Sequence, residues 1–407
     1  MKTIYSHQPL RKVAGVLLSV LLYSMAHCQK EDRMWVCVGR DPVAIDFSDL
    51  LAPKLFEVNS IVENKEWGGI SGLSIASKDG TLLFYAFMNY EGESYRMDIL
   101  NKQNQVIEGS PLKGYLDSEN NLVLPFSNDT NKFHLFSLVY EESDLNYHIL
   151  DMSANDGKGK LLKKDSTILS LSGPPYLSSL TAVKHTNGRD WWLLGHERPG
   201  NRFYRFLLRD DAITGPEYQI IGSDLWNDLR TSNGWHLIDI SDKGDKLAIM
   251  GAHGIAEVYD FDRTSGLLDA PIYFGWPKLT KWINDILVTD YISGITFSSD
   301  SRYIYLATKD TLQQYDLYAH DIAKSKQAIY INDTGISYNY YMRKGPDDKI
   351  YLARLSNSLS QSDTHATYLG VINNPNKAGK ASNYQYLGFD LKGKASWGSL
   401  TYMPPLH

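Results

Sequence analysis

The stretch from Gly234 to Phe274 reads GWHLIDISDKGDKLAIMGAHGIAEVYDFDRTSGLLDAPIYF. Short apolar runs in it alternate with polar residues and are separated by turn-forming Ser, Asp and Gly, a pattern typical of antiparallel strands. The pattern predicts strands at 234–241, 246–251, 255–262 and 269–274. Helical periodicity is scarce along the rest of the chain.

The same unit recurs along the chain. A polar turn followed by an apolar strand returns with a mean period of about 54 residues, which indicates a repeat architecture. The copy after the opening stretch predicts strands at 292–297, 303–309, 312–319 and 326–331. Four antiparallel strands per repeat are the signature of a β-propeller blade. The copies begin at Ser77, Asp117, His185, Ser241, Ser298 and Gly345.

The number of blades follows from the length of the chain. The six countable copies leave one period of the sequence unassigned, so we expect an all-β fold with seven four-stranded blades. We assign the remaining blade to the two ends, with Met34–Asp46 pairing with Ser396–Tyr402 to close the ring. A six-bladed ring is the competing interpretation, whereas a two-sheet sandwich cannot supply so many equal repeats. We expect residues 29–407 to form one propeller domain.

The first 28 residues have the features of a signal peptide. Basic residues precede an apolar run at 13–26, which is too short to span a bilayer stably. Ala26 and Cys28 place a small residue at each of the two positions that a signal peptidase reads, which predicts cleavage before Gln29. We therefore expect an exported protein at the cell surface or outside the cell, or in the periplasm. The alternative is a lipoprotein anchored through Cys28.

Composition excludes several classes of protein. The chain has 41 Lys and Arg against 47 Asp and Glu, a net charge of −6, and this acidic balance argues against binding nucleic acid. After cleavage Cys37 is the only cysteine, so we expect neither an internal disulfide nor a thiolate zinc site. We expect no cofactor.

Several segments resemble one known family. They are Leu180–Glu197, Val258–Gly266, Gly345–Ala353, Tyr368–Asn376 and, at the first strand, Ala44–Ser48. Together they resemble the N-terminal β-propeller region of gliding-motility-associated, type IX-secreted bacterial surface proteins. The resemblance implies a propeller at the cell surface. Members of that family commonly continue into immunoglobulin-like repeats and a sorting domain, which this sequence lacks, so periplasmic residence is also plausible.

Common catalytic motifs are missing from the sequence. It contains no Gly-x-Ser-x-Gly elbow and no phosphate-binding loop. The segment His196–Gly200 begins like a zinc-protease motif, but Pro199 and Gly200 exclude the required helix. We therefore expect no catalytic residue from motifs alone.

One polar group of residues is expected to meet at a face of the propeller. His196 and Glu197 end the second strand of one blade, His236 begins the first strand of the next, and His253 follows its second strand. These positions share the face that carries the inter-blade loops, where imidazoles and a carboxylate could bind a metal or a polar ligand. Alternatively, each His bonds to neighbouring backbone.

Aromatic residues are expected at the same face. Exposed Trp and Tyr side chains suit carbohydrate or protein recognition, although the same rings could instead cover the ends of the blade-to-blade core. The candidate ligand-binding residues are Trp226, Trp276, Trp282, Tyr338, Tyr340 and Tyr341.

These observations lead to one main function and two alternatives. We expect a non-enzymatic binding or scaffold module of the cell envelope whose partner is an envelope protein or an extracellular polysaccharide. It would contact a membrane only if Cys28 is lipidated. One alternative is a propeller enzyme acting on carbohydrate, a glycoside hydrolase or lyase, with Glu197 as its sole suggested carboxylate. The other is a structural subunit of an envelope complex.

Overall fold

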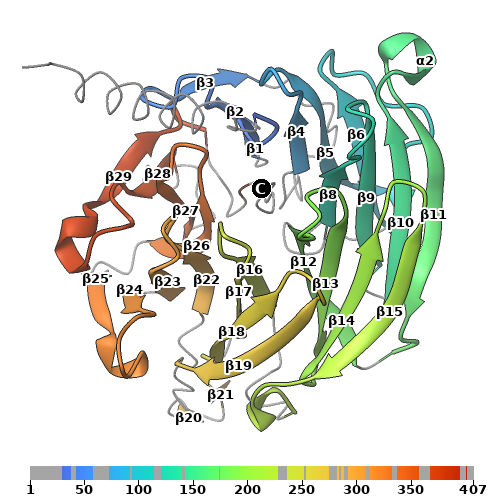
Figure 1. Ribbon diagram of the computed structural model, residues 1–407. Helices are drawn as coiled ribbons and strands as arrows, with labels where there is room; N and C mark the ends of the chain where they lie inside the picture. The colour runs from blue at the N-terminus through green and yellow to red at the C-terminus, as the bar shows by residue number, and fades with distance from the viewer. Residues whose placement is uncertain are drawn as a thin grey trace, which may run out of the picture.

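Seven antiparallel sheets form a ring, as the blades of a β-propeller (Figure 1). The computed structural model describes residues 30–37, 43–57, 73–91, 94–113, 121–139, 143–173, 175–227, 236–251, 254–274, 282–283, 286–287, 292–308, 311–331, 337–356, 367–394 and 400. The seven sheets confirm the expectation of seven blades, and the six-bladed alternative is wrong.

Six blades have four described strands each. They are β4 (Leu73–Ala76), β5 (Leu82–Glu91), β6 (Ser94–Asn101), β7 (Leu112–Lys113); β8 (Asn121–Pro125), β9 (Lys132–Val139), β10 (Asp144–Asp151), β11 (Lys160–Ser170); β12 (Tyr176–Lys184), β13 (Trp191–Arg198), β14 (Arg202–Leu208), β15 (Ile213–Ile220); β16 (His236–Ile240), β17 (Lys246–Gly251), β18 (Ala256–Asp262), β19 (Leu267–Tyr273); β22 (Ile292–Phe297), β23 (Tyr303–Thr308), β24 (Thr311–Asp316), β25 (Gln327–Ile331); and β26 (Ser337–Lys344), β27 (Ile350–Ser356), β28 (Tyr368–Ile372), β29 (Tyr384–Asp390).

The remaining elements are few. The first blade contains β1 (Met34–Cys37), β2 (Val43–Asp46) and β3 (Lys54–Glu57), and a separate ribbon pairs β20 (Trp282–Ile283) with β21 (Ile286–Leu287). The short helical turns are α2 (Ala154–Gly157), η1 (Asp224–Asn227), η2 (Ala323–Ser325) and η4 (Gly379–Ser382). Within the described ranges, no helix has the length and apolar character needed to cross a membrane.

The predicted strands agree with the observed ones because polar side chains in the turns bond to nearby backbone and so fix where the strands begin and end. In the β4–β5 turn the Asp79 carboxylate accepts a hydrogen bond from the Thr81 amide at 2.9 Å. The β22–β23 turn repeats this with Asp300 and the Arg302 amide at 3.0 Å. Such side-chain-to-backbone bonds fix tight turns between the apolar strands.

The inner strands define the two ends of the ring. In six blades the first strand lies nearest the centre of the ring (Figure 1), and the chain then passes outward through the other three. All six inner strands therefore finish at one end, which we call the exit face. Their last residues are Ala76, Pro125, Lys184, Ile240, Phe297 and Lys344.

Strand β1 runs against the neighbouring inner strand. The Ala76 amide donates to the Glu31 carbonyl at 2.9 Å, whereas the Ser74 hydroxyl donates to the Met34 carbonyl at 2.7 Å. Because β1 begins at the exit face, it occupies the position of a second strand, and the first position is left for the predicted closing segment. Residues 396–402 lie outside the described residues except Leu400, which is buried in one core cluster with Trp35.

Candidate functional site

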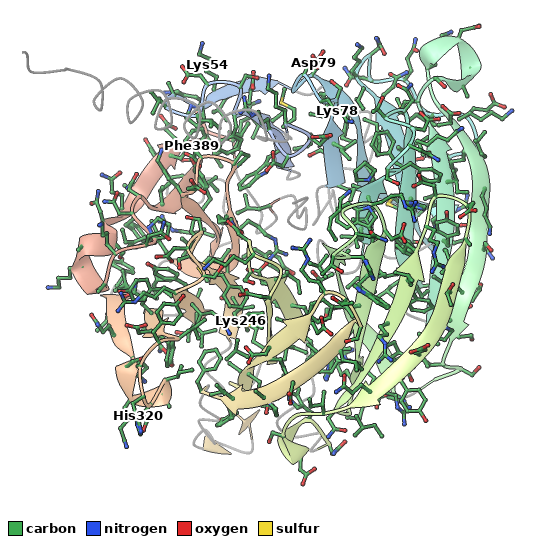
Figure 2. The ribbon with its side chains drawn as sticks, viewed as in Figure 1. Lys54, Lys78, Asp79, Lys246, His320 and Phe389 are labelled. Carbon is green, nitrogen blue, oxygen red and sulfur yellow. The ribbon has the colours of Figure 1, made fainter. Side chains whose placement is uncertain are left out.

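A pocket of about 110 Å³ lies at the exit face, where β4, β8 and β12 end. The strand-connecting turns of three neighbouring blades form it, together with the segment before β1. Figure 2 labels Lys78 and Asp79 at the turn between β4 and β5. The pocket is lined by Glu31, Ala76, Ser77, Lys78, Pro125, Phe126, Ser127, Thr130, Phe133, Lys184 and Gly188.

Glu31 supplies the one carboxylate among these described lining residues. Its side chain is buried, with 5% of the residue exposed. The backbone holds it from two sides, because its carbonyl accepts from the Ala76 amide at 2.9 Å and its Oε2 accepts from the Lys30 amide at 3.0 Å. A fixed carboxylate at a pocket wall is suited to accept a proton.

Lys184 supplies a buried amine to the same pocket. Its Nζ lies 4.4 Å from the centre of the Trp191 ring, and among the described residues it forms no ion pair. Burial lowers the pKa of Lys184, while the carboxylates of Asp210 and Glu31 act in the opposite direction. An amine held over an aromatic ring with no carboxylate bound to it is available to a negatively charged oxygen of a ligand.

The loop between β8 and β9 forms another wall. Phe126 from this loop stacks on His134, with ring centres 4.0 Å apart. Asp210 from the next blade holds the loop, because its carboxylate accepts from the Ser127 amide at 2.9 Å, the Ser127 hydroxyl at 2.8 Å and the Asn128 amide at 3.0 Å. Contacts across a blade boundary therefore position this wall.

Further charged groups lie at the exit face. Lys344 forms an ion pair with Asp242. Asp239 is buried and accepts from the Thr296 hydroxyl at 2.8 Å and from the Phe297 amide at 3.1 Å, while burial raises its pKa. Burial also raises the pKa of Asp32 to about 6, and within the described part of the chain Asp32 Oδ1 has no hydrogen-bond partner.

We expect Asp32 to make stability depend on pH. Because its folded pKa of about 6 lies above the ordinary value of 3.8, the folded state binds the proton more tightly, and this contribution is lost as pH rises through about 6. In the wild type, Asp32 should therefore lower the unfolding free energy by at most about 3 kcal/mol as the pH rises from 4 to 7. Asp32→Asn should not show this decrease. Denaturant unfolding across that range measures it. A pH profile of the variant parallel to that of the wild type would contradict the assignment, and Asp211→Asn is the control.

A second arrangement has the composition of a hydrolase triad but the wrong hydrogen bonds. Ser137 Oγ lies 3.0 Å from His148 Nε2, and Asp165 Oδ1 lies 3.7 Å from His148 Nδ1. However, the Asp165 amide donates to Nδ1 at 2.9 Å, which makes that nitrogen an acceptor. The Ser137 hydroxyl is fully buried and donates to the Lys113 carbonyl at 3.0 Å. The ring therefore cannot act as a base toward the hydroxyl, and the group joins neighbouring strands.

The predicted polar group is only partly brought together. The Nδ1 atoms of His196 and His236 lie 3.2 Å apart, and Ser178 Oγ lies 3.0 Å from that of His236. Both imidazoles are fully buried, and burial lowers the pKa of His196 well below its ordinary value. Glu197 faces a different group, with Oε2 accepting from Arg202 at 3.2 Å and from Tyr204 at 3.3 Å. His253 lies outside the described residues.

A metal site at these histidines is not supported by the geometry. In the ranges that the structure describes, no three His, Cys, Asp or Glu side chains are grouped to hold a metal ion. The two imidazoles instead pack against the Trp226 ring, at centre distances of 5.1 Å and 4.9 Å. This pair stabilises the contact between two blades.

Two of the six rings expected at an exposed aromatic surface lie in the core instead, as in the alternative interpretation. Trp226 is fully buried, and its Nε1 donates to Glu257 at 2.9 Å; Tyr341 is also buried. Trp226 lies in η1, which packs inward against the strand ends, and Tyr341 lies within β26, so each ring belongs to a core cluster. Trp276 lies outside the described residues, as do the side chains of Trp282, Tyr338 and Tyr340.

Trp226→Ala should therefore destabilise the fold. Removing a fully buried indole is expected to cost about 3–5 kcal/mol in unfolding free energy, measured by urea denaturation. Tyr218→Ala, at a residue 60% exposed, is the matched control and should change stability by less than about 0.5 kcal/mol. Equal effects of the two substitutions would mean that Trp226 is not part of the core.

Comparisons with known proteins find the propeller fold in several solved structures. No protein-family model matches the chain, and no curated protein matches it, so the resemblance to gliding-motility proteins stays a prediction. A Bacteroides fragilis structure provisionally described as a 6-phosphogluconolactonase has a TM-score of 0.55 and 12% identity over 91% of this chain and 97% of its own. A Bacteroides uniformis protein of the same description has a TM-score of 0.52 and 14% identity over 84% of this chain and 92% of its own. The periplasmic gluconolactonase of Pseudomonas aeruginosa has a TM-score of 0.51 and 10% identity over 88% of this chain and 97% of its own.

These similarities correct the main functional expectation. At identities of 14% or less they show the fold alone. Even so, the three structures carry hydrolase descriptions, so the leading interpretation as a non-enzymatic binding or scaffold module is wrong. The enzyme alternative is the better supported of the two.

Sequence reasoning missed the pocket residues. Lys184 is the last residue of strand β12 and Glu31 lies in a short polar segment before β1, and neither has a motif around it. A search for charged residues at the ends of inner strands would have found Lys184, because the repeat had already located the strand end that it occupies. Glu31 carries no comparable signal.

Proposed function

We propose that this protein is an exported hydrolase that opens a cyclic ester of a sugar acid, with the pocket at the exit face as its active site. One observation carries the proposal: the pocket combines a buried carboxylate, Glu31, with a buried amine, Lys184, that has no ion pair among the described residues. The hydrolase descriptions of the structural neighbours support the reaction class.

The side chains of the pocket suit each step of ester opening. Glu31 accepts a proton from water as the water oxygen bonds to the carbonyl carbon. The Lys184 ammonium stabilises the negative charge that develops on the carbonyl oxygen. The ring C–O bond then breaks, and the proton held by Glu31 passes to the ring oxygen, which becomes a hydroxyl group. The products are one hydroxy acid and the regenerated enzyme.

The remaining lining groups suit a sugar ring. The Thr130 hydroxyl is a lining group that can bond to a sugar hydroxyl, and Phe126 offers an apolar surface to the ring face. The Ser77 and Ser127 hydroxyls donate to Asp79 and Asp210, so they can serve sugar hydroxyls as acceptors. Glycosidic cleavage is less well supported, because it ordinarily needs two carboxylates and Glu31 is the one carboxylate among the described lining residues.

The proposed location outside the cytoplasm has two supports. The first 28 residues carry the basic and apolar pattern of a signal peptide. One of the structural neighbours is described as periplasmic.

Acid release tests the proposal. Purified protein is assayed in a pH-stat with five- and six-membered aldonolactones, with and without a phosphate group, against the uncatalysed rate and heat-denatured protein. We expect saturable acid release with at least one lactone. Rates equal to the uncatalysed rate for every lactone would contradict the proposal.

A further inference from the structure

We propose that Arg354 forms an anion-binding site between the blade of β22–β25 and the blade of β26–β29, for a small oxyanion or a phosphate or carboxylate group of a ligand. Arg354 lies near the end of β27, a second strand, and therefore away from the exit face. The site is separate from the proposed active site and does not depend on the proposed function.

The Arg354 guanidinium is buried, and the residues that the structure describes give it no counter-charge. None of the residue's surface is exposed. In the part of the chain that the structure describes, Nε and Nη1 have no hydrogen-bond partner and no carboxylate pairs with the group. Nη2 makes one long contact, 3.5 Å to the Tyr384 hydroxyl. A buried, permanently charged group with unused donors is strongly disfavoured unless an anion completes it.

Tyrosines form the walls of the site. The guanidinium carbon lies 3.5 Å from the centre of the Tyr386 ring, and Tyr330 from the neighbouring blade stacks on Tyr386 at 5.3 Å between centres. Figure 1 shows β25 and β29, which carry these rings, as the outer strands of two neighbouring blades. Aromatic faces orient the guanidinium plane without consuming its N–H donors.

A glycine keeps space beside the guanidinium. A side chain at Gly370 would place Cβ 3.1 Å from Arg354 Nη2 and 2.6 Å from the Tyr384 hydroxyl. Burial raises the pKa of Tyr384 to about 12, so its hydroxyl remains a donor that can serve the same anion as the guanidinium.

Arg302 provides an internal comparison. It also lies against tyrosine rings, 5.1 Å from that of Tyr303, but it is partly exposed and its guanidinium is paired with Asp316 at 2.8 and 3.2 Å. Among the described residues, a carboxylate thus pairs with the arginine stacked on tyrosine at one site and none pairs with that at the other. This difference points to a partner for Arg354 from outside the chain.

Thermal unfolding with inorganic phosphate tests the site. In a buffer free of oxyanions, phosphate should raise the melting temperature of the wild type saturably by about 2–5 °C, while chloride of equal ionic strength should not. Arg354→Met should lose this response and be no less stable than the wild type without phosphate. Arg354→Lys, which keeps the charge without the planar fork, should respond more weakly, and Arg302→Met should respond like the wild type.

Two further probes distinguish the source of the anion. A larger shift with a sugar phosphate than with inorganic phosphate would identify a ligand-borne group, and equal shifts would identify the free ion. If the wild type and Arg354→Met shift equally, or if the wild type shows no saturable shift, the guanidinium is satisfied by water and the inference is wrong. If Arg354→Met fails to fold, the phosphate-induced shift of Arg354→Lys is compared with that of the wild type instead.

Discussion

Glu31→Gln is expected to lower kcat for lactone opening by about 10²–10⁴-fold, the usual contribution of a general base. The amide has the same shape, and its oxygen can still accept from the Lys30 amide, which lies 3.0 Å from Glu31 Oε2. Binding groups such as Lys184 are unchanged, so KM should change far less than kcat. Initial rates of acid release over a range of lactone concentrations separate the two constants.

The control for this substitution is Glu108→Gln. Glu108 pairs with Lys160 at 2.8 Å on the surface and is not among the lining residues of the pocket. Its variant should retain wild-type kcat. Loss of activity in Glu108→Gln, or a Glu31→Gln variant with unchanged kcat, would remove Glu31 from the proposed mechanism.

Deleting residues 396–407 is expected to abolish cooperative folding or to lower the melting temperature sharply. Strand β1 occupies a second-strand position, so the deletion would remove the strand predicted to fill the first position and leave an unpaired edge in that blade. It would also remove Leu400 from the core cluster that contains Trp35 and Phe47. Calorimetry of the full and shortened chains measures the effect.

A shorter deletion is the matched control for ring closure. Removing only residues 403–407 leaves the predicted closing segment intact and should change the melting temperature by a few degrees at most. If both shortened chains melt like the full one, the ring is closed by another part of the chain.

The repeat made most of the fold predictable from sequence. Turns built on Asp79 or Asp300 use side-chain bonds to nearby backbone, so local sequence specifies them. Strands predicted at 246–251 and 292–297 appear with those bounds as β17 and β22. Prediction succeeded where the determining contacts lie within a few residues of each other.

The site could not be predicted in this way because distant segments build it. Glu31 reaches the pocket only because β1 runs against β4 and begins at the exit face. Asp210 holds the Ser127 loop from 83 positions away in the sequence. The predicted meeting of His196 and His236 was correct in place, but the inward fold of Trp226 turned that face into core. Which side chains remain accessible depends on loop packing that the repeat does not specify.

A crystal structure of the Glu31→Gln variant soaked with the lactone that the wild type opens most rapidly tests the central claim most directly. The account predicts intact lactone in the exit-face pocket, with its carbonyl oxygen within about 3.5 Å of Lys184 Nζ and its carbonyl carbon facing residue 31. Lactone bound elsewhere on the propeller, with this pocket empty, would contradict it.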